Sequence, residues 1–216
     1  MLMLLASPIA ALTTTAVLKD DFRLLAARND RGFSASASTI ARLQAMATEL
    51  EAATDSEGFA PTASETLLGK WDLDFCDAGD VLSLGLLPLP LGSRIGNIYQ
   101  EIASGSASNE FVVQNGVEIT PPGLISAAFA DAPPLVYEVE ARCKTLDATR
   151  VSLAFVGGRV RPPLLPSAVG GVLPDALITQ VQQAFGERVF LQTTYLDEDF
   201  RVARGPGKEL YVLSKR

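Results

Sequence analysis

Hydrophobic residues in the first sixty positions recur with the period of an α-helix. Leu18, Phe22 and Leu25 fall at i, i+4 and i+7, so they share one helix face. The turn-forming sequence Asn-Asp-Arg-Gly at 29–32 interrupts this pattern. A second apolar stripe follows the turn and consists of Ile40, Leu43, Ala47 and Leu50. We therefore expect two helices and a polar linker within residues 17–60.

From Leu68 onward the hydrophobic period changes from about 3.6 to 2, which is typical of strands with one buried face. In the first of these strands we expect Trp71, Leu73 and Phe75 on one face and charged residues on the other. The clearest alternation lies further along the chain. Its apolar face consists of Leu135, Tyr137, Val139, Ala141 and Cys143, and its polar face of Glu138, Glu140, Arg142 and Lys144.

The same pattern predicts the other strands and their ends. They are expected at 98–102, 111–113, 151–155 and 210–213, and one long strand is expected from 189 to 202. Asn115-Gly116 is a strong signal for a two-residue hairpin turn, with the next strand at 117–119. Gly157-Gly158 is expected to end its strand, and a weaker strand is predicted at 123–130. A short helix is predicted from Pro174 onward, with an apolar face of Leu177, Val181 and Phe185.

About eight strands, each with one apolar face, bury those faces best as an antiparallel sandwich or a closed barrel. A barrel of about eight strands has an interior that can hold one small ligand. We therefore expect a mainly β domain at 61–216, preceded by helices and containing one short C-terminal helix. Residues 1–16 are apolar and too short to span a bilayer. They are either the remnant of a targeting segment or the lead into the first helix.

The composition excludes several classes of function. The chain has no histidine, which removes Ser-His-Asp catalysis, histidine general bases and histidine metal sites. A serine nucleophile would then need a lysine partner, and Lys70 and Lys144 lie on predicted polar faces. The net charge is −7 and no long basic run is present, so the chain lacks a surface for nucleic-acid phosphates. Contact with a membrane would have to be mainly hydrophobic.

The two cysteines, Cys76 and Cys143, are too few for a cysteine-rich zinc site. A disulfide between them is open from the sequence, because spacing along the chain does not bring two Cα atoms into bonding range. In a reducing compartment two free thiols on strands are the expected state.

An acidic run at Asp197, Glu198 and Asp199 has two interpretations. Converging carboxylates could form an oxygen-rich cation site. Successive strand residues point to opposite faces, however, so at most two of the three could converge. We favour a solvated bend that pairs with Arg201 and Arg204, and we predict no metal site.

The segment 81–91 is nearly all apolar and carries Pro88 and Pro90, which exclude a central strand. It lies between the first two predicted strands of the sheet. Two alternatives are open: a lid or lipid-contacting loop, or a loop folded onto the barrel or the helices. The residues that would form the lid or membrane loop are Leu84, Leu86, Leu87, Leu89 and Leu91.

Several motifs together resemble one family. Leu-Leu-Gly-Lys-Trp-Asp-Leu at 67–73 is similar to the opening of the plastid lipid-associated (PAP/fibrillin) proteins, and 95–102 and 149–155 resemble two of their strands. The most specific match is 195–205, followed by Leu-Tyr-Val-Leu at 210–213. The resemblance covers Val17 to Ser214. The sequence departs from the family at 74–77 and lacks a long basic transit peptide. The residues of the structural signature are Gly69, Asp197, Asp199, Arg201, Arg204 and Gly205.

This resemblance implies a lipocalin-like barrel located in plastids, at thylakoids or plastoglobules, and associated with carotenoids, quinones or other prenyl lipids. It implies no catalytic residues and no cofactor beyond a bound lipid or carotenoid. In lipocalin-like barrels a Gly-x-Trp tryptophan closes one end under a cationic side chain, which Arg201 or Arg204 could supply for Trp71. An ordinary core tryptophan is the alternative. The expected lipid-binding residues are Trp71, Leu73, Phe75, Ile98, Gln100, Phe111, Val113, Tyr137, Val139, Val151, Leu153, Phe155 and Tyr195.

Three classes of function follow. The first is a non-catalytic binder of an apolar lipid or pigment, which acts at a peripheral lipid or thylakoid surface. The second is an interaction subunit that docks on a photosynthetic or prenyl-lipid-synthesis complex. The third is an enzyme, against which the absence of histidine and of a convergent acid–base pair argues. An apolar pocket of about 300–1,000 Å³ would favour the first class, and a filled interior the second.

Overall fold

The computed structural model describes residues 8–54, 58–82, 94–120, 135–161 and 190–216. Four of the expectations above fall outside these ranges. They are the segment 83–91 with its five leucines, the strand at 123–130, the helix from Pro174, and residues 1–7.

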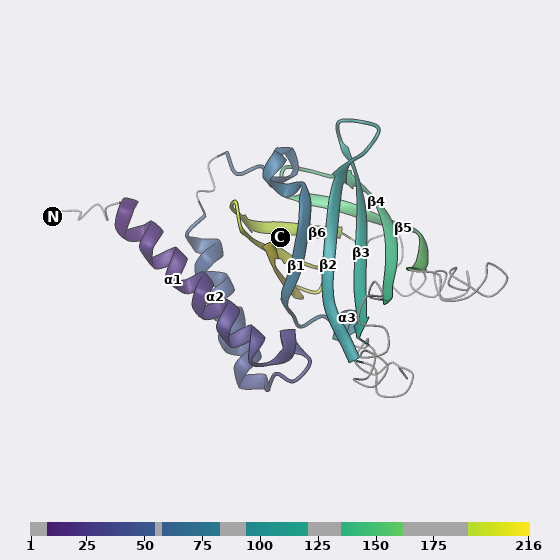
Figure 1. Ribbon diagram of the computed structural model, residues 1–216. Coiled ribbons are helices and arrows are strands. Elements are labelled where there is room, and N and C mark those ends of the chain that lie inside the picture. The colour runs from purple at the N-terminus through teal and green to yellow at the C-terminus, as the bar shows by residue number, and fades with distance from the viewer. Residues whose placement is uncertain (1–7, 55–57, 83–93, 121–134, 162–189) are drawn as a thin grey trace.

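Two helices precede the sheet and lie side by side on one side of it (Figure 1). Helix α1 spans Pro8–Ala27 and helix α2 spans Ala37–Ala52. Ser36 caps α2, because its Oγ accepts a hydrogen bond from the backbone N–H of Thr39 at 3.2 Å. The 3₁₀ turn η1 (Asp30–Gly32) joins them and packs closely on the sheet. At Gly32, where φ is +110°, a Cβ atom would lie 2.2 Å from the carbonyl oxygen of Cys76, so only glycine fits. No helix within the described ranges has both the length and the apolar character needed to cross a bilayer.

Eight antiparallel strands form one sheet that closes in a ring. Each strand pairs with the next along the chain, and β1 pairs with β8. The strands are β1 (Gly69–Cys76), β2 (Arg94–Ser104), β3 (Glu110–Thr120), β4 (Leu135–Thr145), β5 (Arg150–Arg161), β6 (Phe190–Leu196), β7 (Phe200–Arg204) and β8 (Leu210–Lys215). The short elements η2 (Pro61–Ala63) and η3 (Glu65–Leu67) precede β1, and α3 (Gly79–Leu82) follows it. The predicted mainly β, antiparallel architecture with two N-terminal helices is therefore confirmed.

The predicted hairpin at Asn115-Gly116 is wrong, because both residues lie in the middle of β3. Gly116 pairs with Tyr99 on β2 and with Glu138 on β4. A Cβ atom at Gly116 would lie 2.1 Å from Cζ of Tyr99, so the tyrosine ring occupies the space that a side chain would need. Glycine at this position allows the tyrosine ring to approach the backbone closely and does not form a turn.

Two other strand boundaries differ from the prediction. Strand β5 runs through Gly157 and Gly158 to Arg161, so these glycines do not end it. The expected single strand from 189 to 202 is divided into β6 and β7 by the bend at Asp197–Asp199. Its Asp197 side chain accepts hydrogen bonds from the backbone N–H groups of Asp199 and Phe200, which turns the chain back on itself.

The sheet separates two apolar cores. The core between helices and sheet contains, from the helices, Phe22, Ala26, Leu43, Met46, Ala47 and Leu50, and from the strands Phe75, Tyr195, Phe200, Val202, Leu210 and Val212. Phe22 is its hub, with ring centroids 6.0 Å from Phe75 and 5.9 Å from Phe200 in edge-to-face geometry. The second core lies inside the ring and draws on β1 to β4 and β8, with Trp71 fully buried in it.

Two register shifts move predicted inner residues to the helix side. The pairing of β1 with β8 shifts between Leu73 and Phe75, so Phe75 faces the helices while Cys76 joins the interior. The pairing of β6 with β7 shifts between Thr193 and Tyr195, and Tyr195 also joins the helix-side core. The prediction that Trp71, Leu73 and Phe75 share one face is therefore wrong for Phe75, because a bulge resets the alternation.

Candidate ligand-binding interior

The closed sheet brings most of the predicted lipid-binding residues together on its inner face. The interior core or its margin contains Trp71, Leu73, Ile98, Phe111, Val113, Val151, Leu153 and Phe155. Gln100 lines a small cavity within it. Tyr137 and Val139 alternate with the outward Glu138 and stand opposite Val117 and Asn115 of β3. Phe75 and Tyr195 lie on the other side of the sheet and are not part of this inner face.

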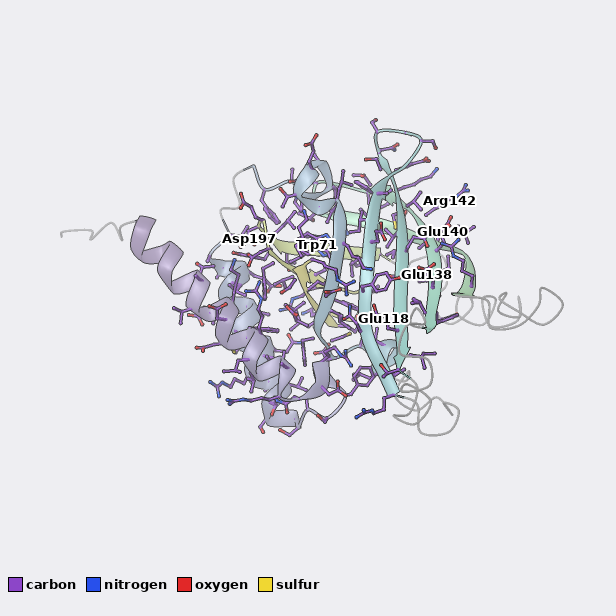
Figure 2. The ribbon with its side chains drawn as sticks, in the orientation of Figure 1. Trp71, Glu118, Glu138, Glu140, Arg142 and Asp197 are labelled. Atoms are coloured by element: carbon purple, nitrogen blue, oxygen red, sulfur yellow. The ribbon has the colours of Figure 1, made fainter. Side chains whose placement is uncertain are left out.

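Trp71, which is labelled in Figure 2, is fully buried, and two cationic side chains lie over its ring. The guanidinium carbon of Arg201 lies 5.1 Å from its ring centroid, and Nζ of Lys215 lies 5.0 Å from it. Its Nε1–H donates a hydrogen bond to the carbonyl oxygen of Leu67 at 2.9 Å, which fixes the ring in place. Of the two arginines considered for this position, Arg201 covers the tryptophan. Lys215 was not predicted, although it lies two residues after the inward Leu213 and alternation places it on the same face.

Arg204 has a different role, because it binds helix α2. Its Nε and Nη2 donate to the two carboxylate oxygens of Glu51 at 2.7 and 3.0 Å, which is a bidentate pair. Its Nη1 donates to Oε1 of Gln44 at 2.8 Å. Arg201, three positions earlier on the same strand, lies on the inner face, so the two arginines of the signature serve opposite faces of the sheet.

Arg201 is the most deeply buried charge of the inner face, with a relative exposure of 1%. Its Nη2 donates to Oε1 of Gln100, and Nε2 of Gln100 donates to Oδ1 of Asn115 at 2.9 Å. These three side chains form a polar chain across β7, β2 and β3. Within the described residues, Nε of Arg201 has no hydrogen-bond partner. Burial lowers the pKa of Arg201 to about 9.

A cavity of about 20 Å³ lies against Arg201 inside the ring. Its other walls are Leu67, Gln100, Ile102, Phe111, Val113, Cys143, Val151, Leu153, Leu191 and Thr193. This volume has room for a group the size of one water molecule. It is far below the roughly 300–1,000 Å³ that a whole small-molecule ligand requires. In the part of the chain that the structure describes, the interior around Arg201 is therefore nearly filled.

Strands β5 and β6 meet at a seam whose continuation, at residues 162–189, lies outside the described residues. In the described residues these strands pair at three positions, from Arg150 to Ser152 of β5. Strands β4 and β5 pair at ten positions by comparison. Leu153 and Phe155 follow Val151 on the inner face of β5, beyond the paired positions, and are only half-buried. These two side chains thus leave part of the apolar inner face uncovered.

The acidic bend pairs with helix α1, and the prediction that it pairs with Arg201 and Arg204 is wrong. Nζ of Lys19 lies 2.9 Å from Asp197 and 2.5 Å from Asp199, and Nη2 of Arg23 lies 2.8 Å from Asp199. Burial alone would raise the pKa of Asp199, but Lys19 and Arg23 hold it well below its usual range. The partners were missed because the sequence does not show which helix packs beside the bend.

The signature glycines also have structural roles. Gly69 begins β1 with φ at +112°, a left-handed conformation that favours glycine. Gly205 starts the turn before β8, where its N–H donates to the carbonyl oxygen of Glu209 at 3.0 Å. With the bend and Arg204, the signature thus joins both helices to the last strands of the sheet.

Both cysteines are free thiols and both are buried. Cys143 lines the cavity, and burial raises the pKa of its thiol to about 12. Across residues 8–54, 58–82, 94–120, 135–161 and 190–216, no group of three acidic or cysteine side chains is placed to hold a metal ion. The described interior thus presents an apolar wall, one polar chain and buried cations.

A closed antiparallel sheet with an apolar inner face and two helices on one side defines a mainly β domain. The chain belongs to the PAP_fibrillin family, whose model matches residues 18–214. It is 27% identical to "Probable plastid-lipid-associated protein 1, chloroplastic" of Arabidopsis thaliana, over 86% of this chain and 64% of that protein. It is 31% identical to "Light-induced protein, chloroplastic" of Solanum demissum, over 86% and 63%.

A third relative is the "Chromoplast-specific carotenoid-associated protein, chromoplastic" of Cucumis sativus, which is 28% identical over 86% of this chain and 63% of its own length. The chain thus spans less than two thirds of the length of these relatives. No solved structure matches the chain. The predicted family is confirmed, and the names of the relatives agree with the predicted plastid location.

Proposed function

We propose that this chain is a non-catalytic lipid-associated protein of plastids that holds an apolar prenyl lipid or pigment inside its lipocalin-like closed sheet. It would act at a thylakoid or plastoglobule surface. The observation that carries the proposal is the mainly apolar inner face to which β1 to β5 contribute. The names of the relatives, which refer to plastid lipids and to carotenoids, support the same class of ligand.

The β5–β6 seam is the proposed entry for the apolar chain of the ligand. The cavity of about 20 Å³ beside Arg201 has room for a group the size of one water molecule, so an apolar chain bound against it would have to displace neighbouring inner side chains. In the described residues, β5 and β6 pair at three positions, all of them before Leu153. Leu153 and Phe155 are half-buried there, and contact with an apolar chain would remove the rest of their surface from water.

Binding of β-carotene to the delipidated chain tests this proposal, because the pigment reports its environment through its visible absorption. Leu153→Gln combined with Phe155→Gln should weaken binding at least about tenfold, since two apolar contacts are lost. The matched control is Ala154→Gln with Val156→Gln on the same strand, where both native side chains are exposed. Equal loss of binding in the control pair, or no loss in the inner pair, would contradict an interior site.

The second candidate is an interaction subunit that docks on a photosynthetic or prenyl-lipid-synthesis complex. The small volume of the described cavity favours it, because a filled ring leaves the outer surface as the functional part. Under this alternative the delipidated chain binds neither β-carotene nor a quinone, and its inner-face variants change stability but no binding. Pigment binding that depends on Leu153 and Phe155 would exclude it.

A further inference from the structure

The closed sheet buries a positive charge for which the described residues supply no negative partner. Arg201 is 1% exposed, and its one hydrogen bond goes to the neutral amide of Gln100. The residues that line the adjoining cavity include no aspartate or glutamate. Burying a charge is unfavourable unless it is paired and fully hydrogen-bonded. Arg201 therefore has both an unpaired charge and an unpartnered Nε–H.

Two carboxylates of β4, those of Glu138 and Glu140, lie on the outer face of the sheet. Glu138 accepts hydrogen bonds from Tyr99 at 2.9 Å and from Arg159 at 2.8 Å on the outer face. Glu140 binds Gln114 on the same face, and Figure 2 shows Glu138 and Glu140 on the side of the molecule away from the helices. The carboxylate of Asp197 at the bend forms an ion pair with Lys19. Each of these carboxylates already has its own partners.

The cavity beside Arg201 has the chemistry of a head-group site and room for one oxygen of such a group. Its volume of about 20 Å³ accepts one small polar group, and its walls beyond Gln100, Thr193 and Arg201 are almost entirely apolar. A guanidinium N–H binds carboxylate oxygens better than neutral acceptors, because the hydrogen bond is charge-assisted. A water molecule would satisfy the N–H but would leave the charge unpaired.

We propose that Arg201 binds the carboxylate of a single-chain amphiphile whose apolar chain lies along the inner face toward β5. The proposal rests on the proposed function, since it assigns the head-group end of the same interior site. A methyl ester or a quinone carbonyl can accept the hydrogen bond, but neither neutralises the guanidinium. The site should therefore distinguish an acid from its own ester.

Calorimetric titration of the delipidated chain with palmitic acid and with methyl palmitate tests this assignment. The acid should bind at least about tenfold more tightly than the ester, which is the scale of one charge-assisted hydrogen bond. In Arg201→Met the ratio should fall to about one. Arg204→Met, which removes the same charge from the helix-facing side of β7, should keep the ratio of the unmodified chain. Arg201→Lys should keep a preference for the acid.

The outcomes separate this proposal from the proposed function. Equal affinities for acid and ester in the unmodified chain, or a preserved ratio in Arg201→Met, overturn the head-group assignment and leave lipid binding intact. Failure of palmitic acid, methyl palmitate and β-carotene to bind overturns both. If Arg201→Met does not fold, the comparison of acid with ester in the unmodified chain and in Arg201→Lys decides the matter.

Discussion

Replacement of Trp71 should cause the largest loss of stability at any single position of the inner face. The side chain is fully buried, and truncation of a buried aromatic residue to alanine costs about 3–5 kcal/mol. Two further losses move the expected value toward the upper end of this range. The contacts with Arg201 and Lys215 contribute about 0.5–2 kcal/mol as cation–π interactions. The hydrogen bond to Leu67 contributes about 0.5–1.5 kcal/mol net.

These contributions are not additive, because they involve neighbouring groups in one cluster. Trp71→Phe separates them, since it keeps an aromatic ring for the two cations and removes the indole N–H. The carbonyl of Leu67 then loses its partner, for an expected cost of about 1–3 kcal/mol. Trp71→Phe should therefore lie between the unmodified chain and Trp71→Ala.

Urea unfolding followed by far-UV circular dichroism measures these differences. Tryptophan fluorescence cannot be used for the variants, because Trp71 is the single tryptophan of the chain. Arg201→Met can be compared with Arg204→Met in the same unfolding measurement. Arg204 lies on the helix-facing side and does not cover the indole, so its variant controls for the loss of a charge on β7. A free energy of unfolding for Trp71→Ala within about 1 kcal/mol of the unmodified chain, the scale of a surface substitution, would refute the role of Trp71 as the centre of the inner core.

Three further predictions test other parts of the structure. Gly116→Ala should destabilise by about 1–3 kcal/mol in thermal unfolding, because the new Cβ overlaps an aromatic ring, whereas Gly157→Ala has open space and should change stability by less than about 1 kcal/mol. The Cys143 thiol, with a pKa raised to about 12, should not react with a thiol reagent at pH 8 until the chain is unfolded; rapid reaction of the folded chain would contradict its burial. Leu86→Asp with Leu87→Asp should reduce flotation with lipid particles while leaving thermal stability within about 1 kcal/mol, and unfolding of this variant would place both leucines in the core instead.

The sequence was sufficient for the architecture because period and burial agree over most of the chain. The alternation in β4 and the helical stripe at Leu43 and Leu50 each predicted the correct element, and Ala141, Cys143, Leu43 and Leu50 are buried as expected. Glu138 of the predicted polar face of β4 is buried as well, where Tyr99 and Arg159 bind it. The first part of β1 was also correct, with Trp71 and Leu73 inside the ring. These cases share one property: a single period runs through the whole element without interruption.

The errors arose where a local rule competed with a tertiary contact. Asn115-Gly116 has the composition of a hairpin turn. The glycine is needed inside β3 instead, because the ring of Tyr99 on the neighbouring strand β2 occupies the space of a side chain. Phe75 and Tyr195 follow bulges, and a bulge of one residue reverses the face of every later side chain. No feature of the strand sequence itself marks either bulge.

The candidate site shows the same division. Alternation placed Cys143 on the inner face, and it also places Lys215 there, so Lys215 could have been predicted from its strand. The partners of Asp199 could not, because Lys19 and Arg23 are about 180 positions away and reach the bend only through the packing of α1 on the sheet. Likewise, the sequence suggested a covering arginine for Trp71 but did not choose between Arg201 and Arg204, which depends on the register of β7.

Lipid extraction and mass spectrometry of the protein purified from its own source test most directly whether this chain carries an apolar lipid or pigment. We expect a prenyl lipid, a carotenoid or a single-chain acid in near-stoichiometric amount. The amount should fall in a chain purified in the same way with Leu153→Gln and Phe155→Gln, and should be maintained with Ala154→Gln and Val156→Gln. Lipid at the level of an unrelated control protein, or equal lipid in both pairs of variants, would contradict binding inside the closed sheet.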